Sequence, residues 1–310
     1  MKTISSVAKK QLSFSLLLLL FFSQYSEAIK LEKETLLSNN HSMVLWHKQP
    51  QEVTDKTEQI LLLHGRTWSS LPDFDLQVSG EKLSLMDNLV ELGFSVWALD
   101  ARGYGETKRD PSGWNNPNKA ALDVKNTIEW IQQKTSTKPT LFGWSYGSMV
   151  SQLVVQKYPN IVKSVILYGY PIDPEQVIPK QDKVSTPKRE INTKENAASD
   201  FIIPGSISQK AIDAYVNESL KADPIRADWN HIEEWNQLDA KKITTPLLLL
   251  QGEHDPLAKS ESHARFFIRL PNANKQWVVL AGGDHAALLE TPKHRLSHSI
   301  RDFVNWLKLD

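Results

Sequence analysis

Six short runs of apolar residues recur along the chain, and within each run the apolar positions are consecutive rather than alternating with polar ones. The runs are residues 60–63, 95–99, 140–142, 165–167, 247–250 and 277–280. A strand that is covered on both faces has no solvent-facing side, so its residues are apolar without alternation. The runs therefore predict the strands of a parallel sheet wrapped by helices.

Between these runs, apolar residues recur at the spacing of an amphipathic helix. Two stripes show this spacing, one of Ala121, Val124, Ile128 and Ile131 and one of Ile300, Phe303, Val304 and Leu307. Residues three or four apart lie on the same face of a helix, so each stripe is a surface that packs against a sheet. Helices and strands that alternate in this way predict an α/β domain.

The segment from residue 171 to residue 242 breaks this rhythm. It is rich in charge and proline, has no strong strand run, and contains few large apolar residues, among them Phe201, Tyr215, Trp229 and Trp235. A structureless loop of that length is unusual in a compact domain. We therefore predict a mainly helical cap at residues 171–242, inserted between two parts of the core at residues 29–170 and 243–310.

The first 28 residues differ from the rest of the chain. Lysines at positions 2, 9 and 10 lead into an apolar stretch that ends with residues 16–22, and Ser26-Glu27-Ala28 follows. This order is typical of a secretory signal peptide with cleavage after Ala28. The apolar stretch is shorter than the roughly 20 residues of a membrane span. We expect a signal peptide at residues 1–28, export to the periplasm or the medium, and no stable membrane span after cleavage.

Charge and cysteine content exclude several classes of function. The chain has 36 basic and 36 acidic residues, and no basic cluster that would follow a phosphate backbone. Nucleic acid is therefore not an expected partner. The chain has no cysteine, which excludes disulfides, thiolate catalysis and cysteine-ligated zinc. We expect no metal site.

The pentapeptide Gly143-Trp144-Ser145-Tyr146-Gly147 joins a predicted strand to a helix-like segment, residues 148–155. A Gly-x-Ser-x-Gly sequence in this context is typical of a nucleophile elbow. Its glycines relieve crowding around a strained turn that holds the serine hydroxyl clear of the backbone. A plain turn between strand and helix is the competing interpretation. We predict that Ser145 is a catalytic nucleophile.

A serine hydroxyl is weakly nucleophilic, so Ser145 requires an imidazole that takes its proton and a carboxylate that orients the imidazole. His285 follows the last predicted strand after two glycines, and Asp255 lies in the loop that leaves the strand at residues 247–250. We predict that His285 is the base and Asp255 the orienting acid.

Two other acids compete with Asp255 for this role. Asp284 adjoins His285, although adjacent side chains tend to diverge, and Glu253 lies nearer the strand end. Asp255 itself has a second interpretation, as the cap of a helix that starts near Ser260. His254 is interpreted as a loop residue and not as a second base.

Acyl transfer also requires donors that stabilise an oxyanion, usually two backbone amides. The amide of Tyr146, the residue after the nucleophile, is the first candidate. The second comes from the turn after the strand at residues 60–63, where Gly65 allows a sharp bend. The Arg66 amide is the preferred donor and the Thr67 amide the second choice. We expect His64 to brace this turn by hydrogen bonds.

Aromatic residues lie in or beside the loops at the expected mouth of the site. Trp68, Trp114 and Trp144 are predicted to line a substrate pocket, and core filling is the competing interpretation. Three partners are considered for the Arg66 side chain. These are an acid of the cap, an anionic part of the substrate, and a structural ion-pair partner.

These pieces together resemble the α/β-hydrolase superfamily, and more narrowly its lidded lipase, esterase and peptidase branch. The matching segments are His64-Gly65, residues 100–105, residues 143–147, residues 252–255 and Gly283-Asp284-His285. The resemblance implies a mostly parallel eight-stranded sheet flanked by helices, a cap after the sixth strand, and hydrolysis without a cofactor. Serine at position 145 speaks against dehalogenase and epoxide-hydrolase relatives, which use aspartate there. Residues 100–105 are interpreted as a structural turn without a catalytic role.

The leading functional hypothesis is hydrolysis of a small-molecule carboxylic ester through an acyl-enzyme on Ser145. The nearest rival is an aminopeptidase, which would hold a substrate ammonium with acids of the cap. The available acids are Glu190, Glu195, Asp200, Glu233 and Glu234. A lactone or macrolide-type esterase and a cofactor-free perhydrolase are narrower hypotheses, and a non-catalytic binding protein on this fold is the least favoured.

Overall fold

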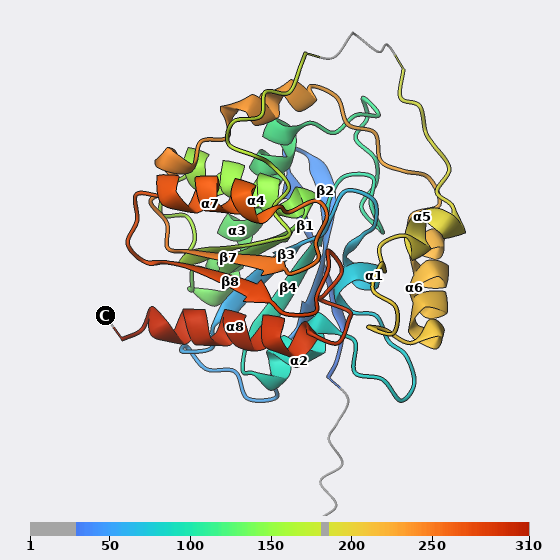
Figure 1. Cartoon of the computed structure of the whole chain (residues 1–310), viewed down its shortest axis with the longest axis horizontal. Helices are drawn as coiled ribbons and strands as arrows, with labels where there is room; N and C mark the ends of the chain where they lie inside the picture. Colours follow the sequence, from blue (N-terminus) through green and yellow to red (C-terminus); the bar gives the residue numbers. More distant parts are fainter. Residues whose placement is uncertain (1–28, 181–185, 310) are drawn as a thin grey trace, which may run out of the picture.

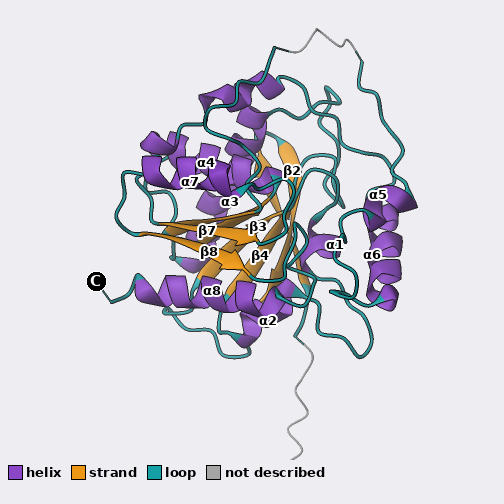
Figure 2. Ribbon diagram, in the orientation of Figure 1, coloured by secondary structure: helices purple, strands orange, loops and turns teal. Residues whose placement is uncertain are grey.

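The computed structural model describes residues 29–180 and 186–309 of the chain. The signal peptide predicted at residues 1–28 therefore lies outside the described residues. In the described part, an eight-stranded sheet has the order β1-β2-β4-β3-β5-β6-β7-β8 and carries helices on both sides (Figures 1 and 2). This is the mostly parallel α/β sheet that the sequence predicts.

The parallel part of the sheet coincides with the six apolar runs. Its strands are β3 (Gln59–Leu63), β4 (Ser95–Asp100), β5 (Thr140–Trp144), β6 (Ser164–Tyr168), β7 (Leu247–Gly252) and β8 (Lys275–Leu280). Every residue of β3 to β7 is buried, because helices cover both faces. Parallel strands end at one edge of the sheet, so the loops that follow them lie close together there.

Two further strands, β1 (Glu32–Ser38) and β2 (His41–Lys48), form an antiparallel hairpin that the apolar runs do not reveal. Partly buried and exposed positions alternate along the first half of β1, which lies at the edge of the sheet. Asn39 and Asn40 form the two-residue turn, with φ of 47° and 62°. Asparagine tolerates this left-handed conformation better than most residues, which suits it to such a turn.

Alternate positions of each strand enter two separate cores, one on each face of the sheet. One helical layer consists of α2 (Leu85–Glu91) and α8 (Lys293–Trp306), and the other of α3 (Pro117–Thr135), α4 (Tyr146–Lys157) and α7 (Ser260–Arg269). Figure 1 shows these layers on opposite sides of the strands. Ile60 and Leu62 belong to the first core, and Leu61 and Leu63 belong to the second. The predicted apolar stripes lie on α3 and α8.

The long segment between β6 and β7 includes the residues, 171–242, for which a mainly helical cap is predicted. Its helical elements are α5 (Lys194–Ala198), α6 (Gln209–Ala222), η1 (Ile232–Gln237) and η2 (Ala240–Lys242), and irregular chain joins them. Helix α6 packs against α1 (Ser70–Phe74), at the right of the sheet in Figure 1. Among the described residues, none of the helices combines the length and the apolar character that crossing a bilayer demands.

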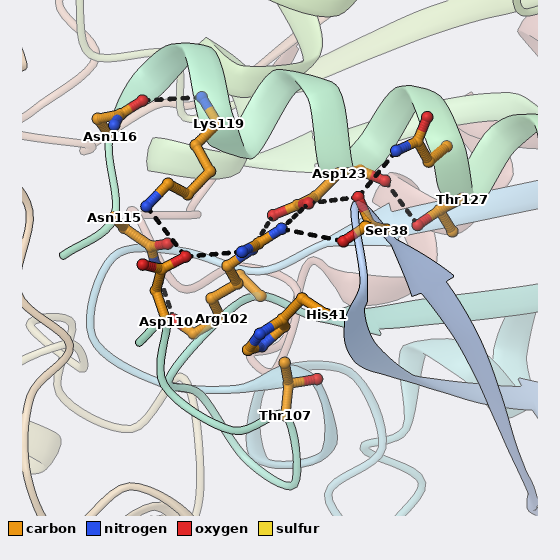
Figure 3. A network of polar contacts seen from close by, with 12 residues as sticks. Ser38, His41, Arg102, Thr107, Asp110, Asn115, Asn116, Lys119, Asp123 and Thr127 are labelled. Atoms are coloured by element: carbon orange, nitrogen blue, oxygen red, sulfur yellow. Dashed lines mark hydrogen bonds and ion pairs between the residues drawn. The ribbon is translucent and has the colours of Figure 1, made fainter. Parts of the chain in front are cut away.

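A buried ionic network fixes the turn that follows β4 (Figure 3). Arg102, only 7% exposed, donates to both carboxylate oxygens of Asp123 on α3 at 2.7 Å and to Asp110 at 2.6 Å. Ser38, at the end of β1, donates to Asp123 at 2.5 Å. The network therefore joins the hairpin, the turn after β4 and α3, and it satisfies a guanidinium that would be costly to bury alone.

We predict that Arg102→Met lowers the free energy of unfolding by about 3–5 kcal/mol, because it leaves the Asp123 carboxylate buried without its cationic partner. Urea unfolding at neutral pH measures this change. The control is Lys30→Met, which removes an exposed ion pair with Glu32 and should cause no measurable loss. Equal effects of the two substitutions would contradict the prediction.

Candidate active site

The turn between β5 and α4 places Ser145 in a strained conformation. Ser145 has φ of 54° and ψ of −117°, a region that residues with a side chain rarely adopt. Its amide donates to the carbonyl oxygen of Tyr168 at 2.9 Å, which ties the turn to β6. The residue is partly exposed at the carboxyl edge of the sheet. This is the geometry of a nucleophile elbow.

Gly147 allows α4 to start directly against the neighbouring strand. A Cβ at this position would lie 2.6 Å from the His64 carbonyl oxygen and would clash with that of Leu63 as well. No side chain fits there, so glycine is required for the close approach. The approach brings the start of α4 beside the turn that follows β3.

His285 and Asp255 meet at the ends of the two neighbouring strands β7 and β8. The imidazole Nδ1 lies 2.8 Å from Asp255 Oδ2. The other carboxylate oxygen accepts the amides of Leu257 at 2.9 Å and Ala258 at 3.2 Å. Because a carboxylate only accepts hydrogen bonds, we assign the imidazole proton to Nδ1, which leaves Nε2 free to act as a base.

The two competing acids lie elsewhere. Asp284 is fully buried and accepts the amides of Ala286 at 2.7 Å and Ile202 at 3.1 Å. Glu253 is exposed and accepts the Gly282 amide at 2.8 Å. Neither makes a hydrogen bond to the His285 ring, so the structure brings Asp255 to the imidazole. Helix α7 begins after Lys259, and Asp255 does not cap it.

Two aromatic residues hold the loop that carries His285. The Trp144 indole donates to the His285 carbonyl oxygen at 2.8 Å. The Tyr168 hydroxyl donates to the Asp284 carbonyl oxygen at 2.8 Å and accepts the Ala287 amide at 2.9 Å. The backbone on both sides of His285 is thus anchored to β5 and β6. Trp144 is predicted as a pocket residue, and here it also has this buttressing role.

Gly169 is a site residue that the sequence analysis misses. It follows β6 with φ of 57°, and a Cβ there would lie 2.9 Å from His285 Cε1 and 3.3 Å from Asp255 Oδ2. The imidazole therefore packs directly on the glycine backbone. The only signal in the sequence is a glycine at the end of a predicted strand, which by itself does not indicate such a contact.

The turn after β3 is braced by His64, as predicted. His64 is buried, and burial lowers its pKa to about 4, so the ring is neutral at physiological pH. Its Nε2 accepts the Ala101 amide at 3.1 Å, which places the proton on Nδ1, and Nδ1 donates to the Gly65 carbonyl oxygen at 2.8 Å. Gly65 lies against the elbow, with its ideal Cβ position 3.7 Å from Ser145 Cβ.

The predicted oxyanion donors flank this contact. Within the described residues, the amides of Arg66, Thr67 and Tyr146 donate to no protein acceptor. Tyr146 is the first residue of α4, so its amide also points along the positive end of the helix dipole. The Arg66 amide, which is the preferred donor, and the Thr67 amide, which is the second choice, therefore both lack a protein acceptor within the described residues.

The turn after β4 contacts the turn after β3, which carries the predicted oxyanion donor Arg66. The sequence analysis assigns the turn after β4 only a structural role. The Tyr104 hydroxyl donates to the Arg66 carbonyl oxygen and accepts the Trp229 indole N–H at 2.9 Å. Trp229 belongs to the insertion. Tyr104 is thus a positioning residue that connects the insertion to the backbone of Arg66. Its role depends on residues distant in sequence, so no local pattern reveals it.

A cavity of about 450 Å³ opens above the elbow, and Ser145 and His285 both line it. Trp68 and Trp144 line the cavity as predicted, whereas Trp114 does not. Trp114 instead lies on the loop before α3, where its carbonyl oxygen accepts from the Lys119 ammonium at 2.9 Å. The insertion supplies Trp235 to the lining in its place.

The Arg66 side chain also lines the cavity, and it is exposed. Its guanidinium carbon lies 5.5 Å from the centroid of the Tyr146 ring, a cation–π arrangement. Within the described residues it forms no ion pair. The Tyr146 hydroxyl accepts the Trp235 indole N–H at 2.8 Å, so the insertion also fixes this ring.

Of the five cap acids weighed as ammonium ligands, Asp200 lines the cavity and the other four do not. No group of three or more His, Asp or Glu side chains in the described part of the chain is placed to hold a metal ion. The reactive side chains that the cavity brings together are the serine and the imidazole.

Comparisons with known proteins identify a family and a shared fold. A family model described as serine aminopeptidase, S33, matches residues 54–292. The serine hydrolase BPHL of Mus musculus is 24% identical over 273 residues, which cover 85% of this chain and 82% of that protein. A probable alcohol acetyltransferase of Wickerhamomyces anomalus is 27% identical over 290 residues, which cover 80% of this chain and 79% of that protein.

Among solved structures, a serine hydrolase from the polyaromatic hydrocarbon-degrading bacterium Cycloclasticus zankles aligns with a TM-score of 0.66. The alignment covers 89% of this chain and 98% of that one, at 16% sequence identity. Similarity at this level of identity shows a shared fold.

We predict that Gly169→Ala lowers kcat/KM by about a hundredfold, because the new methyl group displaces the His285 ring from its productive position. Initial rates on a nitrophenyl ester measure the effect. Gly80→Ala is the matched control, since Gly80 also has a positive φ, of 84°, but has open space around it. If both variants retain full activity, Gly169 does not position the imidazole.

We predict that Tyr104→Phe lowers kcat/KM by about tenfold to a hundredfold, because the Arg66 backbone loses the hydroxyl that anchors it. Steady-state kinetics measure this loss. In the control Tyr158→Phe, the lost hydroxyl makes no hydrogen bond within the described residues, and activity should persist. A loss that appears only in KM, with kcat intact, would argue against a role in oxyanion stabilisation.

Proposed function

This chain belongs to the serine aminopeptidase S33 family, and we propose that it hydrolyses a carboxylic ester through an acyl-enzyme on Ser145. It is a serine hydrolase with the α/β-hydrolase fold. The observation that carries the proposal is the 2.8 Å contact of His285 with Asp255, beside the cavity that Ser145 and His285 share.

In the first half of the reaction, Nε2 of His285 takes the proton of the Ser145 hydroxyl while the oxygen attacks the ester carbonyl carbon. The carbonyl oxygen becomes an oxyanion, which accepts hydrogen bonds from the amides of Tyr146 and Arg66. Each such donor is worth about 3 kcal/mol in the transition state. The tetrahedral intermediate then collapses, His285 gives its proton to the leaving alkoxide, and the alcohol departs.

In the second half, His285 takes a proton from water, whose oxygen attacks the acyl-enzyme carbonyl carbon. The carboxylic acid leaves and the proton returns to Ser145. Asp255 stabilises the imidazolium that forms in each half and keeps the ring oriented. The acyl-enzyme can equally pass its acyl group to an alcohol, and the similarity to a protein named as an alcohol acetyltransferase makes transfer worth assaying.

An aminopeptidase activity is the second candidate. It is favoured by one observation, that Asp200 of the insertion lines the cavity, because a peptide amino terminus is a cation. The same acyl-enzyme chemistry serves an amide, with an amine as the leaving group. We further propose that the chain is exported, on the basis of the signal-peptide pattern of residues 1–28.

We predict that a fluorophosphonate probe labels Ser145 in the folded protein and that Ser145→Ala lowers ester turnover at least about a thousandfold. Ser136→Ala is a matched control, since Ser136 also has a positive φ, of 58°, but lies exposed after α3. Both variants should melt near the wild-type temperature, because neither change removes buried apolar surface.

Nitrophenyl esters of graded chain length, assayed beside amino-acid nitroanilides, distinguish the two candidates. If the anilides are cleaved and the esters are not, the aminopeptidase hypothesis replaces the ester hydrolase hypothesis. Absence of labelling in folded protein would favour a non-catalytic binding protein. A large loss of stability in Ser145→Ala, and not in Ser136→Ala, would assign Ser145 a structural role.

A further inference from the structure

The loop between β8 and α8, which carries His285, also holds two buried acids. Asp284 directly precedes His285, and Glu290 lies at the other end of the loop; neither acid is exposed to solvent. Their carboxyl groups lie within hydrogen-bonding reach of each other. An ionised carboxylate can only accept a hydrogen bond, so a bond between the two groups requires that one of them carries a proton.

The hydrogen bonds around the pair assign this proton to Glu290. Asp284 Oδ1 accepts the Ala286 amide at 2.7 Å and Oδ2 accepts the Ile202 amide at 3.1 Å, a setting that favours an ionised carboxylate. Glu290 Oε1 accepts the Ser206 hydroxyl at 2.6 Å, whereas the buried Oε2 has no hydrogen-bond donor within the described residues. A proton on Oε2 satisfies this oxygen and provides the hydrogen bond to Asp284.

The surroundings of Glu290 favour its neutral form. Burial raises the pKa of Glu290 to about 8; the Ser206 hydroxyl opposes this rise and the Asp284 carboxyl adds to it. An acid with a raised pKa keeps its proton until the pH rises through the raised value. Glu290 is therefore mostly neutral at physiological pH and ionises in the mildly alkaline range.

Titratable groups of three other elements surround the pair. Tyr168 of β6 is near both acids, and it stays neutral because burial raises its pKa well above the ordinary value. Asp200 of the insertion is near Asp284; burial raises the pKa of Asp200 to about 6, and Asp284 adds to this rise. Lys293 of α8 has its Nζ 3.5 Å from the Glu290 carbonyl oxygen. Within the described residues, no lysine or arginine forms an ion pair with either acid of the pair.

The pair also connects the insertion to the loop of His285. The insertion donates to both acids, through the Ile202 amide and the Ser206 hydroxyl. The Ser206 carbonyl oxygen in turn accepts the Thr291 amide at 2.8 Å and the Thr291 hydroxyl at 2.9 Å. Asp284 accepts the amide of the residue that follows His285. A change in the pair therefore reaches the insertion and the backbone on both sides of His285.

Ionisation of Glu290 would place two negative charges in a site without a cationic partner. Like charges repel each other strongly where water is excluded. Both acids belong to the loop of His285, so they separate only if the loop moves. The imidazole packs on Gly169 and lies 2.8 Å from Asp255. A shift of the loop by a fraction of an ångström would disturb this contact and lower the rate.

We propose that Glu290 is a positioning residue for His285 and that it acts as a neutral acid, through a hydrogen bond from its carboxyl proton to Asp284. The protonated pair holds the loop and the insertion in the arrangement that brings His285 to Asp255. Loss of the proton releases this arrangement. The effect on rates rests on the proposed ester hydrolysis, whereas the protonation of Glu290 can be measured without turnover.

The kinetic test follows kcat/KM on a neutral nitrophenyl ester as a function of pH. In the wild type, kcat/KM should fall by about tenfold or more as the pH rises through about 8, because the neutral acid is then lost. Glu290→Gln should keep its activity near pH 7 and should lack this fall, since an amide donates to Asp284 and accepts from Ser206 without titrating. Glu290→Ala should be impaired at every pH.

Glu253→Gln is the matched control for the kinetic test. Glu253 lies in the loop after β7, is exposed, and accepts the Gly282 amide at 2.8 Å, which a glutamine oxygen can also accept. This variant should keep the wild-type pH profile, including the alkaline fall. Recovery of the profile by glutamine but not by alanine at position 290 separates a role of the neutral acid from a requirement for bulk alone.

Two further measurements do not depend on catalysis. The infrared absorption of protonated carboxyl groups should lose one component with a midpoint near pH 8 in the wild type, and Glu290→Gln should lack this component. The Ala286 and Ile202 amides, which bind Asp284, should lose protection from hydrogen exchange over the same pH range in the wild type. This second measurement keeps the test decisive if Glu290→Gln does not fold.

An alkaline fall that persists unchanged in Glu290→Gln would overturn the proposal. So would a wild-type protein in which no protonated carboxyl group is lost near pH 8, or in which both amides stay protected through that range. Failure of the proposed function has a different signature. If no ester is hydrolysed but the infrared component and the amide protection are lost together near pH 8, the protonated pair stands and ester hydrolysis does not.

Discussion

The hydrogen bond between His285 and Asp255 is the interaction on which the rest of the site depends. It determines which imidazole nitrogen carries the proton and therefore which one is free to accept a proton in the cavity that Ser145 also lines. The pairing is possible because β7 and β8 are neighbours in the sheet and end at the same edge. Trp144, which anchors the backbone of His285, and Gly169, on which the ring packs, leave the imidazole little freedom to turn.

The position of the turn after β3, which carries the predicted oxyanion donor Arg66, depends on the insertion as much as on the sheet. The order β3, β5 in the sheet brings the turn after β3 against the elbow, and Gly147 permits the contact. In the insertion, Trp229 donates a hydrogen bond to the Tyr104 hydroxyl, which in turn donates to the Arg66 carbonyl oxygen. Trp235 donates a hydrogen bond to the Tyr146 hydroxyl. The insertion therefore contacts both residues whose amides are the predicted oxyanion donors.

Two-sided burial makes most of the fold predictable, because it leaves unbroken apolar runs in β3 to β7. Strand β8 lies at the sheet edge and is mostly partly buried, yet it also carries an apolar run. Strand β1 lacks such a run because it is half exposed, whereas β2 carries a buried apolar run at residues 43–46 that the sequence analysis does not use. Local motifs predict Ser145 and His285, and the structure places both at one cavity. The choice of Asp255 over Asp284, the exclusion of Trp114 from the cavity and the role of Gly169 depend on contacts between distant segments, which no local pattern encodes.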